Sequence, residues 1–250
     1  MTNFKDHFSA LSSGYAAYRP SYPAELFVYL ASLVDEHAAV WDCATGSGQA
    51  AVALTGYFDR VLATDASASQ IENAPRHEKI SFRIARAENS GLEDDSQNLV
   101  TVAQALHWFD LDAFYTEVRR VLKAEGVLAV WSYNLFRLTP EIDRVIEHFY
   151  RVTLEDYWPP ERQFVENGYR DLPFPAGEID TPEFAMTAEW SLEHLLGYLN
   201  TWSAVKRFNQ STGRDGVAGI TPALRDAWPA ESTSLPVSWP LSLRVARLDR

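Results

Sequence analysis

The stretch that decides the fold is VWDCATGSGQAAVAL, residues 40–54. A short apolar run at residues 38–43 is typical of a strand buried on both faces of a parallel sheet. The alanine-rich end of the stretch favours a helix. Between them, Gly46 and Gly48 carry no Cβ, so the backbone can turn tightly and a ligand can approach it closely. The order of strand, glycine turn and helix predicts a first βα unit.

Four more strand-like segments follow and alternate with helical patterns. Strands are expected at residues 60–64, 80–85, 98–103 and 126–131. A helix preceding the last of them is expected to begin at Asp110, with Lys123 in its last turn, and to stop at Gly126. Strands that alternate with helices indicate a parallel sheet covered on both faces.

The second half of the chain has a different pattern. Residues 184–190 and 237–245 alternate apolar with polar or small side chains, as half-buried strands do. Residues 140–170 have a helical pattern that Trp158, Pro159 and Pro160 interrupt, and residues 191–233 have a helical pattern rich in aromatic residues. We therefore expect an α/β fold with a doubly wound, Rossmann-like sheet of seven strands, five of them parallel and the last antiparallel, and a helical cap.

Composition and charge exclude several classes of protein. No apolar run of about 18 residues is present, so we expect no membrane span. The first ten residues are too polar for a secretory signal, and the single cysteine, Cys43, favours a reduced, cytoplasmic protein. The net charge of −12 disfavours a nucleic-acid partner. The six histidines are scattered without metal-ligand spacing, so no metal site is expected.

An acidic residue completes the glycine turn. Asp65 follows Gly48 by 17 residues, at the end of the second expected strand. Because ligands bind at the carboxyl ends of parallel strands, its carboxylate can accept hydrogen bonds from both hydroxyls of a ribose. The pair predicts a ligand that contains adenosine.

Two kinds of adenosine ligand fit this pattern. The glycine turn, with Ala51 after it, also matches the dinucleotide fingerprint, so an NADP-binding oxidoreductase or a non-catalytic nucleotide-binding protein is an alternative. Asp42, four residues before Gly46, suits a cationic amino group better than a pyrophosphate. Almost 40 residues precede the turn, whereas dinucleotide enzymes usually place it near the chain start. These features favour the amino group of S-adenosylmethionine (SAM).

Segments along nearly the whole chain resemble the motifs of class I SAM-dependent methyltransferases of the type 11 group, in the small-molecule subgroup of trans-aconitate methyltransferase and its relatives. The segment VWDCATGSGQAAVAL resembles the first motif of the family, and VLATDASASQI resembles the second. RAENSGLEDDSQNLVTVAQALHWFD resembles the third and fourth motifs, and VRRVLKAEGVLAVWSY the fifth. The resemblance implies one domain over residues 1–250, with a lid segment at 1–37, a SAM-binding core at 38–133 and an acceptor-side cap with closing strands at 134–250. Ala44 stands where the family usually has a glycine, and Arg86 where many relatives have an aspartate.

The resemblance also implies which residues bind the cofactor SAM. Its methionine part would be held by Asp42 and the backbone of residues 44–48, its ribose by Asp65, and its adenine by residues near the next two strands. The full set of cofactor-binding candidates is Tyr15, Arg19, Asp42, Ala44, Gly46, Gly48, Asp65, Ala66, Gln70, Ala87, Glu88, Gln104 and Ala105.

The acceptor of the methyl group is expected to be a small molecule. His107, just past the fourth strand, is a candidate general base, needed only if the acceptor carries a proton. Candidates for the acceptor site are Trp108, Tyr133, Trp202 and Arg207. An arginine there would suit a carboxylate. A SAM-dependent enzyme acting on tRNA or protein is the remaining alternative.

Overall fold

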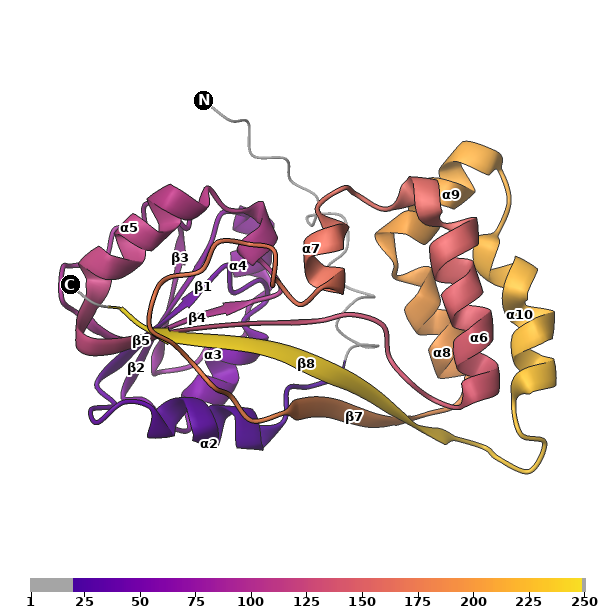
Figure 1. Ribbon diagram of the computed structural model, residues 1–250, viewed down its shortest axis with the longest axis horizontal. Coiled ribbons are helices and arrows are strands. Elements are labelled where there is room, and N and C mark those ends of the chain that lie inside the picture. Colours follow the sequence, from indigo (N-terminus) through magenta and orange to yellow (C-terminus); the bar gives the residue numbers. More distant parts are fainter. Residues whose placement is uncertain (1–19, 249–250) are drawn as a thin grey trace.

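The computed structural model describes residues 20–248 (Figure 1). Tyr15 and Arg19, two of the cofactor-binding candidates, lie outside the described residues. Figure 1 shows an elongated molecule in which a sheet with its covering helices forms one end and a group of helices forms the other. Within the described residues, no helix is long and apolar enough to cross a lipid bilayer.

The first five strands form the expected parallel sheet. They are β1 (Ala39–Cys43), β2 (Arg60–Asp65), β3 (Ile80–Ile84), β4 (Gln97–Ala103) and β5 (Leu122–Tyr133). Their order in the sheet is β3-β2-β1-β4-β5, and every neighbouring pair is parallel. Successive strands are added on one side of β1 up to β3, and on its other side from β4 onward. The connections that follow β1 and β4 therefore lead to opposite sides of the sheet and leave room for a ligand between them.

The last strand, β8 (Leu235–Arg247), runs antiparallel to β5, as expected. Its other edge pairs with β7 (Phe184–Trp190) and with β6 (Glu178–Ile179), both antiparallel. The sheet therefore has eight strands where the sequence predicted seven. The additional strand, β6, has only two residues, too few to show any alternation.

Helices cover both faces of the sheet. One face packs against α2 (Ala24–Ser32) and α3 (Gln49–Leu54), and the other against α5 (Leu111–Val121) and α7 (Arg162–Glu166). The short helix α4 (Ala68–Glu72) follows β2. Burial on both faces explains why the five parallel strands read as apolar runs rather than as alternating patterns.

The remaining helices form the cap at the far end of β7 and β8 (Figure 1). They are α6 (Pro140–His148), α8 (Leu192–Asn200), α9 (Ser203–Thr212) and α10 (Gly216–Ala227). A π-helical turn at Phe149–Thr153 extends α6, and short 3-10 turns lie at Leu106–Trp108 and Glu155–Tyr157. The cap has its own apolar core, which includes Phe136 and Trp239 and continues onto β7 and β8. The expected helical cap is thus present.

One helix end differs from its prediction. Asp110 caps α5 through a hydrogen bond from the Ala113 N–H, as expected, but α5 ends at Val121. Lys123 lies in β5 rather than in the helix. A Cβ at Gly126 would lie 2.8 Å from the Lys123 carbonyl oxygen, so this glycine serves a tight bend within β5 and not a helix stop.

Candidate functional site

The loop between β1 and α3 has an unusual backbone. Ala44, Gly46 and Gly48 all adopt left-handed conformations, with φ of 54°, 58° and 86°. A Cβ at Gly48 would lie 3.0 Å from the Phe82 ring, so tight packing adds to the left-handed backbone in favouring glycine there. At Gly46, the nearest atom to an added Cβ is Oε1 of Gln70, 3.9 Å away. Glycine at this position keeps open the space between the loop and Gln70.

Asp65 joins this loop to the end of β2. One carboxylate oxygen accepts a hydrogen bond from the Gly46 N–H at 2.9 Å, and the other from the Ser67 N–H at 2.8 Å. The Asp65 carboxylate thus lies at the glycine turn, where it is a candidate to accept the hydroxyls of a ribose. The structure places the glycine turn and this carboxylate side by side, as expected from parallel strands.

Asp42 lies buried at the end of β1. It accepts hydrogen bonds from the hydroxyl of Thr101 at 2.8 Å and from that of Thr45 at 2.5 Å. Burial raises the pKa of Asp42 to about 6, so the carboxyl group is mostly ionised at pH 7. A buried anion held by two hydroxyls is a suitable partner for a cationic amino group.

The adenine-side candidates lie after β2 and β3. Ala66 directly follows Asp65, and Ala87 is buried in the loop that follows β3. Glu88 forms an ion pair with Arg86 at 3.2 Å and accepts a hydrogen bond from the Asp110 N–H. Glu88 is thus already engaged by its own loop and by the start of α5.

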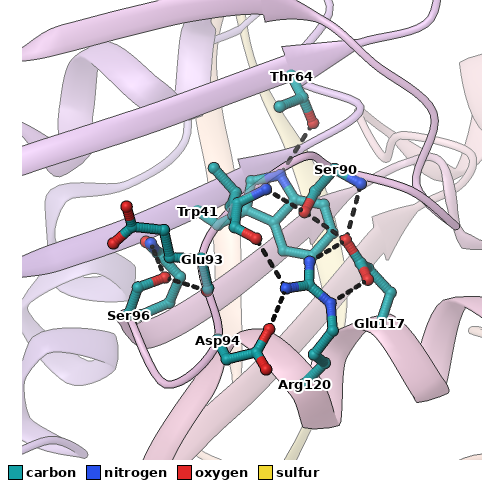
Figure 2. Close-up of polar contacts among 10 residues, drawn as sticks. Trp41, Thr64, Ser90, Glu93, Asp94, Ser96, Glu117 and Arg120 are labelled. Atoms are coloured by element: carbon teal, nitrogen blue, oxygen red, sulfur yellow. Dashed lines mark hydrogen bonds and ion pairs between the residues drawn. The ribbon is translucent and has the colours of Figure 1, made fainter.

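A buried carboxylate from α5 fixes the loop that carries Ala87 and Glu88 (Figure 2). Glu117 accepts hydrogen bonds from both the N–H and the hydroxyl of Ser90, at 2.8 and 2.5 Å. Arg120 binds the same carboxylate and also the Leu92 carbonyl oxygen at 2.7 Å. The loop is therefore held in place without a ligand.

Gln104 and Ala105 occupy the end of β4. Gln104 has a left-handed backbone with φ of 58°, and its side chain donates to the Tyr133 carbonyl oxygen at 2.7 Å. Its N–H donates to the carbonyl oxygen of Trp131 at 2.9 Å. These contacts tie the ends of β4 and β5 together beside the glycine loop of β1.

His107 is enclosed rather than exposed. Its Nδ1 lies 2.9 Å from the hydroxyl of Tyr169, and the Trp108 ring lies beside it at 4.6 Å between centroids. Burial, helped by the nearby charge of Arg162, lowers the pKa of His107 to about 3. The imidazole is therefore neutral at pH 7.

The structure separates the other acceptor-site candidates into two groups. Tyr133 is buried at the end of β5, with the Tyr22 ring 6.4 Å away. Trp202 lies in the cap, 5.5 Å from the ring of Trp158. Arg207 also lies in the cap and donates to the carbonyl oxygen of Tyr157.

Sequence reasoning missed Arg162, Asn134 and Tyr169. Arg162 binds Asn134 and the hydroxyl of Tyr150, which places a cation next to the ends of β4 and β5. These contacts span 28 and 12 residues of sequence, and no local pattern signals them. The one signal near Arg162 in the sequence is the aromatic pair Tyr157 and Trp158, which could line an acceptor cavity.

A hollow of about 360 Å³ borders the glycine loop. It is lined by Ser21, Tyr22, Phe27, Ser47, Gly48, Gln49, Val52, Ala53 and Pro75. Neither Asp65 nor Gln104 lines it, so it adjoins the proposed cofactor site without coinciding with it. No group of three or more His, Cys, Asp or Glu side chains in residues 20–248 is arranged to hold a metal ion.

Comparisons with known proteins decide the family. A family model described as a methyltransferase domain matches residues 41–130. A protein of Dictyostelium discoideum named as a methyltransferase is 33% identical over 99% of this chain and 97% of its own length. The chain belongs to the class I SAM-dependent methyltransferases. The motifs that resembled this family are therefore confirmed, and the NADP-binding alternative has no support.

A solved structure and a more distant relative agree with this assignment. The structure, described as a type II methyltransferase of Anaeromyxobacter dehalogenans, is 43% identical, covers 93% of this chain and 99% of its own, and has a TM-score of 0.88. A Saccharomyces cerevisiae protein named as a SAM-dependent methyltransferase is 28% identical over 49% of this chain and 45% of its own length.

The residues of this methyltransferase fit SAM as the cofactor. The Asp65 carboxylate, bonded to the Gly46 N–H, suits the ribose, and the buried anion of Asp42 suits the amino group. Ala44 departs from the family glycine yet adopts the left-handed backbone that glycine favours. The loop therefore keeps its shape, although alanine is strained there.

The strain at Ala44 is measurable. We expect Ala44→Gly to raise the free energy of unfolding by roughly 0.5–1 kcal/mol, because relief of the left-handed strain exceeds the added flexibility of the unfolded chain. Ala53→Gly, the same change within helix α3, should lower it by about 1 kcal/mol. Urea denaturation of both variants measures the difference, and a loss of stability in Ala44→Gly would contradict the strain.

The role of Asp65 is tested by binding. We expect Asp65→Ala to weaken the binding of S-adenosylhomocysteine by one to two orders of magnitude, on the scale of about 1.5–3 kcal/mol for charged hydrogen bonds. Asp59→Asn, an exposed change just before the opposite end of the same strand, is the matched control and should bind normally. Isothermal titration calorimetry gives both constants. Unchanged affinity in Asp65→Ala would remove this carboxylate from the ribose site.

Proposed function

We propose that this methyltransferase transfers the methyl group of SAM to a carboxylate of a small molecule. The acceptor would lie between the carboxyl ends of β4 and β5 and the helical cap, beside Gln104 and Ala105. Bound SAM supplies a methyl group on a cationic sulfur, which is a good leaving group. One carboxylate oxygen would form a bond to the methyl carbon as the carbon–sulfur bond breaks. The electron pair of the carbon–sulfur bond would go to sulfur. The products are a methyl ester and S-adenosylhomocysteine, and no proton is transferred.

The environment of His107 supports an acceptor that needs no base. A phenol has a pKa near 10, far above the pKa of about 3 of the His107 imidazole, so moving its proton to this imidazole is strongly unfavourable. A carboxylate arrives already ionised and avoids this cost. We propose that His107 borders the acceptor as a neutral hydrogen-bonding group and does not act as a general base.

The remaining residues would act by positioning. The loop that contains Gly46 and the carboxylates of Asp42 and Asp65 would fix the donor. Tyr133, Trp108 and Trp202 would exclude water around the acceptor. Alignment of two reactants and exclusion of water can supply most of the acceleration of an in-line displacement.

A macromolecular acceptor is the second candidate, and charge argues against its nucleic-acid form. The net charge of −12 repels a polyanion such as tRNA over most of the surface. We also propose a cytoplasmic location, because the single cysteine, Cys43, cannot form a disulfide within the chain.

A transfer assay with methyl-labelled SAM tests the acceptor class. We expect label to pass to members of a panel of small carboxylic acids, as esters that mild base hydrolyses, and not to tRNA or to purified protein. Asp65→Ala, which should bind SAM weakly, is the control and should transfer much less label. Label on tRNA or protein but on no small molecule would contradict the proposal.

The pH dependence distinguishes a carboxylate from a phenol. Between pH 7 and 9, Asp42 is ionised above its pKa of about 6 and His107 is neutral above its pKa of about 3. With saturating SAM, kcat/KM for a carboxylic acid should therefore be flat across this range. Without a usable base, a phenol should react about tenfold faster per pH unit, because only its ionised form attacks. A rise of that size with the carboxylic acid would contradict the mechanism.

A further inference from the structure

Arg162 lies where the cap meets the carboxyl ends of the sheet. It is the first residue of α7, which packs against β5. Its Nη2 donates to the Asn134 side chain and its Nε to the Tyr150 hydroxyl, both at 2.7 Å. The guanidinium carbon also lies 5.1 Å from the ring centre of Trp158. Two hydrogen bonds and an aromatic ring therefore hold this half-buried cation in one orientation.

The charge of Arg162 is not balanced by a neighbour. Within residues 20–248, its guanidinium makes no ion pair and its Nη1 makes no hydrogen bond. The nearest acid along its network, Glu166, accepts instead from the Tyr150 hydroxyl at 2.6 Å. Two other partly buried arginines are paired: Arg120 binds Glu117 and Arg244 binds Glu178. Arg207, also partly buried, instead donates to the carbonyl oxygen of Tyr157. A half-buried cation with an uncommitted donor favours an anion from outside the chain.

The position of Arg162 would place that anion near the ends of β4 and β5, where the proposed function puts the acceptor. Asn134, which it binds, directly follows Tyr133, and the Tyr133 carbonyl oxygen holds the side chain of Gln104. Its charge also reaches His107, just past the end of β4. The uncommitted nitrogen thus belongs to the same region as the ends of β4 and β5, whereas Arg207 binds a carbonyl oxygen within the cap.

We infer that Arg162 is the residue that selects an anionic acceptor, one with an apolar body that packs against Trp158 and Trp202. Only Nη1 lacks a partner, so it binds one oxygen of the acceptor carboxylate and leaves the other free to attack. A bidentate pair, in which two guanidinium nitrogens bind the carboxylate, would instead engage both of its oxygens. This inference rests on the proposed function, since it names the residue that reads the acceptor.

The experiment compares benzoate with its neutral analogue benzamide. Both are titrated into protein saturated with S-adenosylhomocysteine, and binding is followed by calorimetry. We expect wild-type protein to bind benzoate at least tenfold more tightly than benzamide. Arg162→Gln should abolish this preference while S-adenosylhomocysteine binds as before, which shows that the variant is folded. Arg162→Lys keeps the charge and should keep part of the preference.

Matched variants decide between this role and others. Arg144→Gln removes an exposed cation of the cap, paired with Glu141, and should keep the full preference for benzoate. The inference is overturned if wild-type protein does not prefer benzoate, if Arg162→Gln keeps the preference, or if only Arg207→Gln removes it. Should the preference depend on Arg162 while no acid is methylated, the anion site stands and the proposed reaction falls.

Discussion

The bridge made by the Asp65 carboxylate between the Gly46 N–H and the Ser67 N–H is the contact on which the site depends. It exists because β1 and β2 pair in parallel with Cys43 opposite Thr64, so the two strands end side by side. The bridge fixes the glycine loop before any ligand is present. Donor binding then requires little rearrangement, and less of the binding energy is lost to ordering the loop.

Charge is distributed unequally across this edge of the sheet. The donor side carries the carboxylates of Asp42 and Asp65, which attract a cation that holds an amino group and a positive sulfur. The proposed acceptor side carries the cation of Arg162. In our proposal, opposite charges on the two sides would orient the reactants, because an anionic acceptor would be repelled from the donor pocket and drawn toward the cap. Both reactants would then be held in the order that an in-line displacement needs.

The parts of this structure that follow local rules were predictable from the sequence. The glycine turn and Asp65 were placed together because parallel strands end at one edge, whatever the rest of the chain does. The strands of the core were recognised by short apolar runs, but the end of α5 was not, because Lys123 and Gly126 fit a helix end as well as a bend in β5. Arg162 escaped prediction because contacts between distant segments define its role.

The burial of His107 and the unpaired charge of Arg162 have a common cause in the packing of α7 against the sheet. The segment that starts with α7 brings Tyr169 onto His107, which removes water from the imidazole and lowers its pKa. The same segment brings Arg162 to the end of β5, where its charge lowers that pKa further. Burial of the imidazole thus removes a usable base, and the proposed acceptor is one that is already ionised. In this proposal, the cation brought by the same segment is also the group that binds the acceptor.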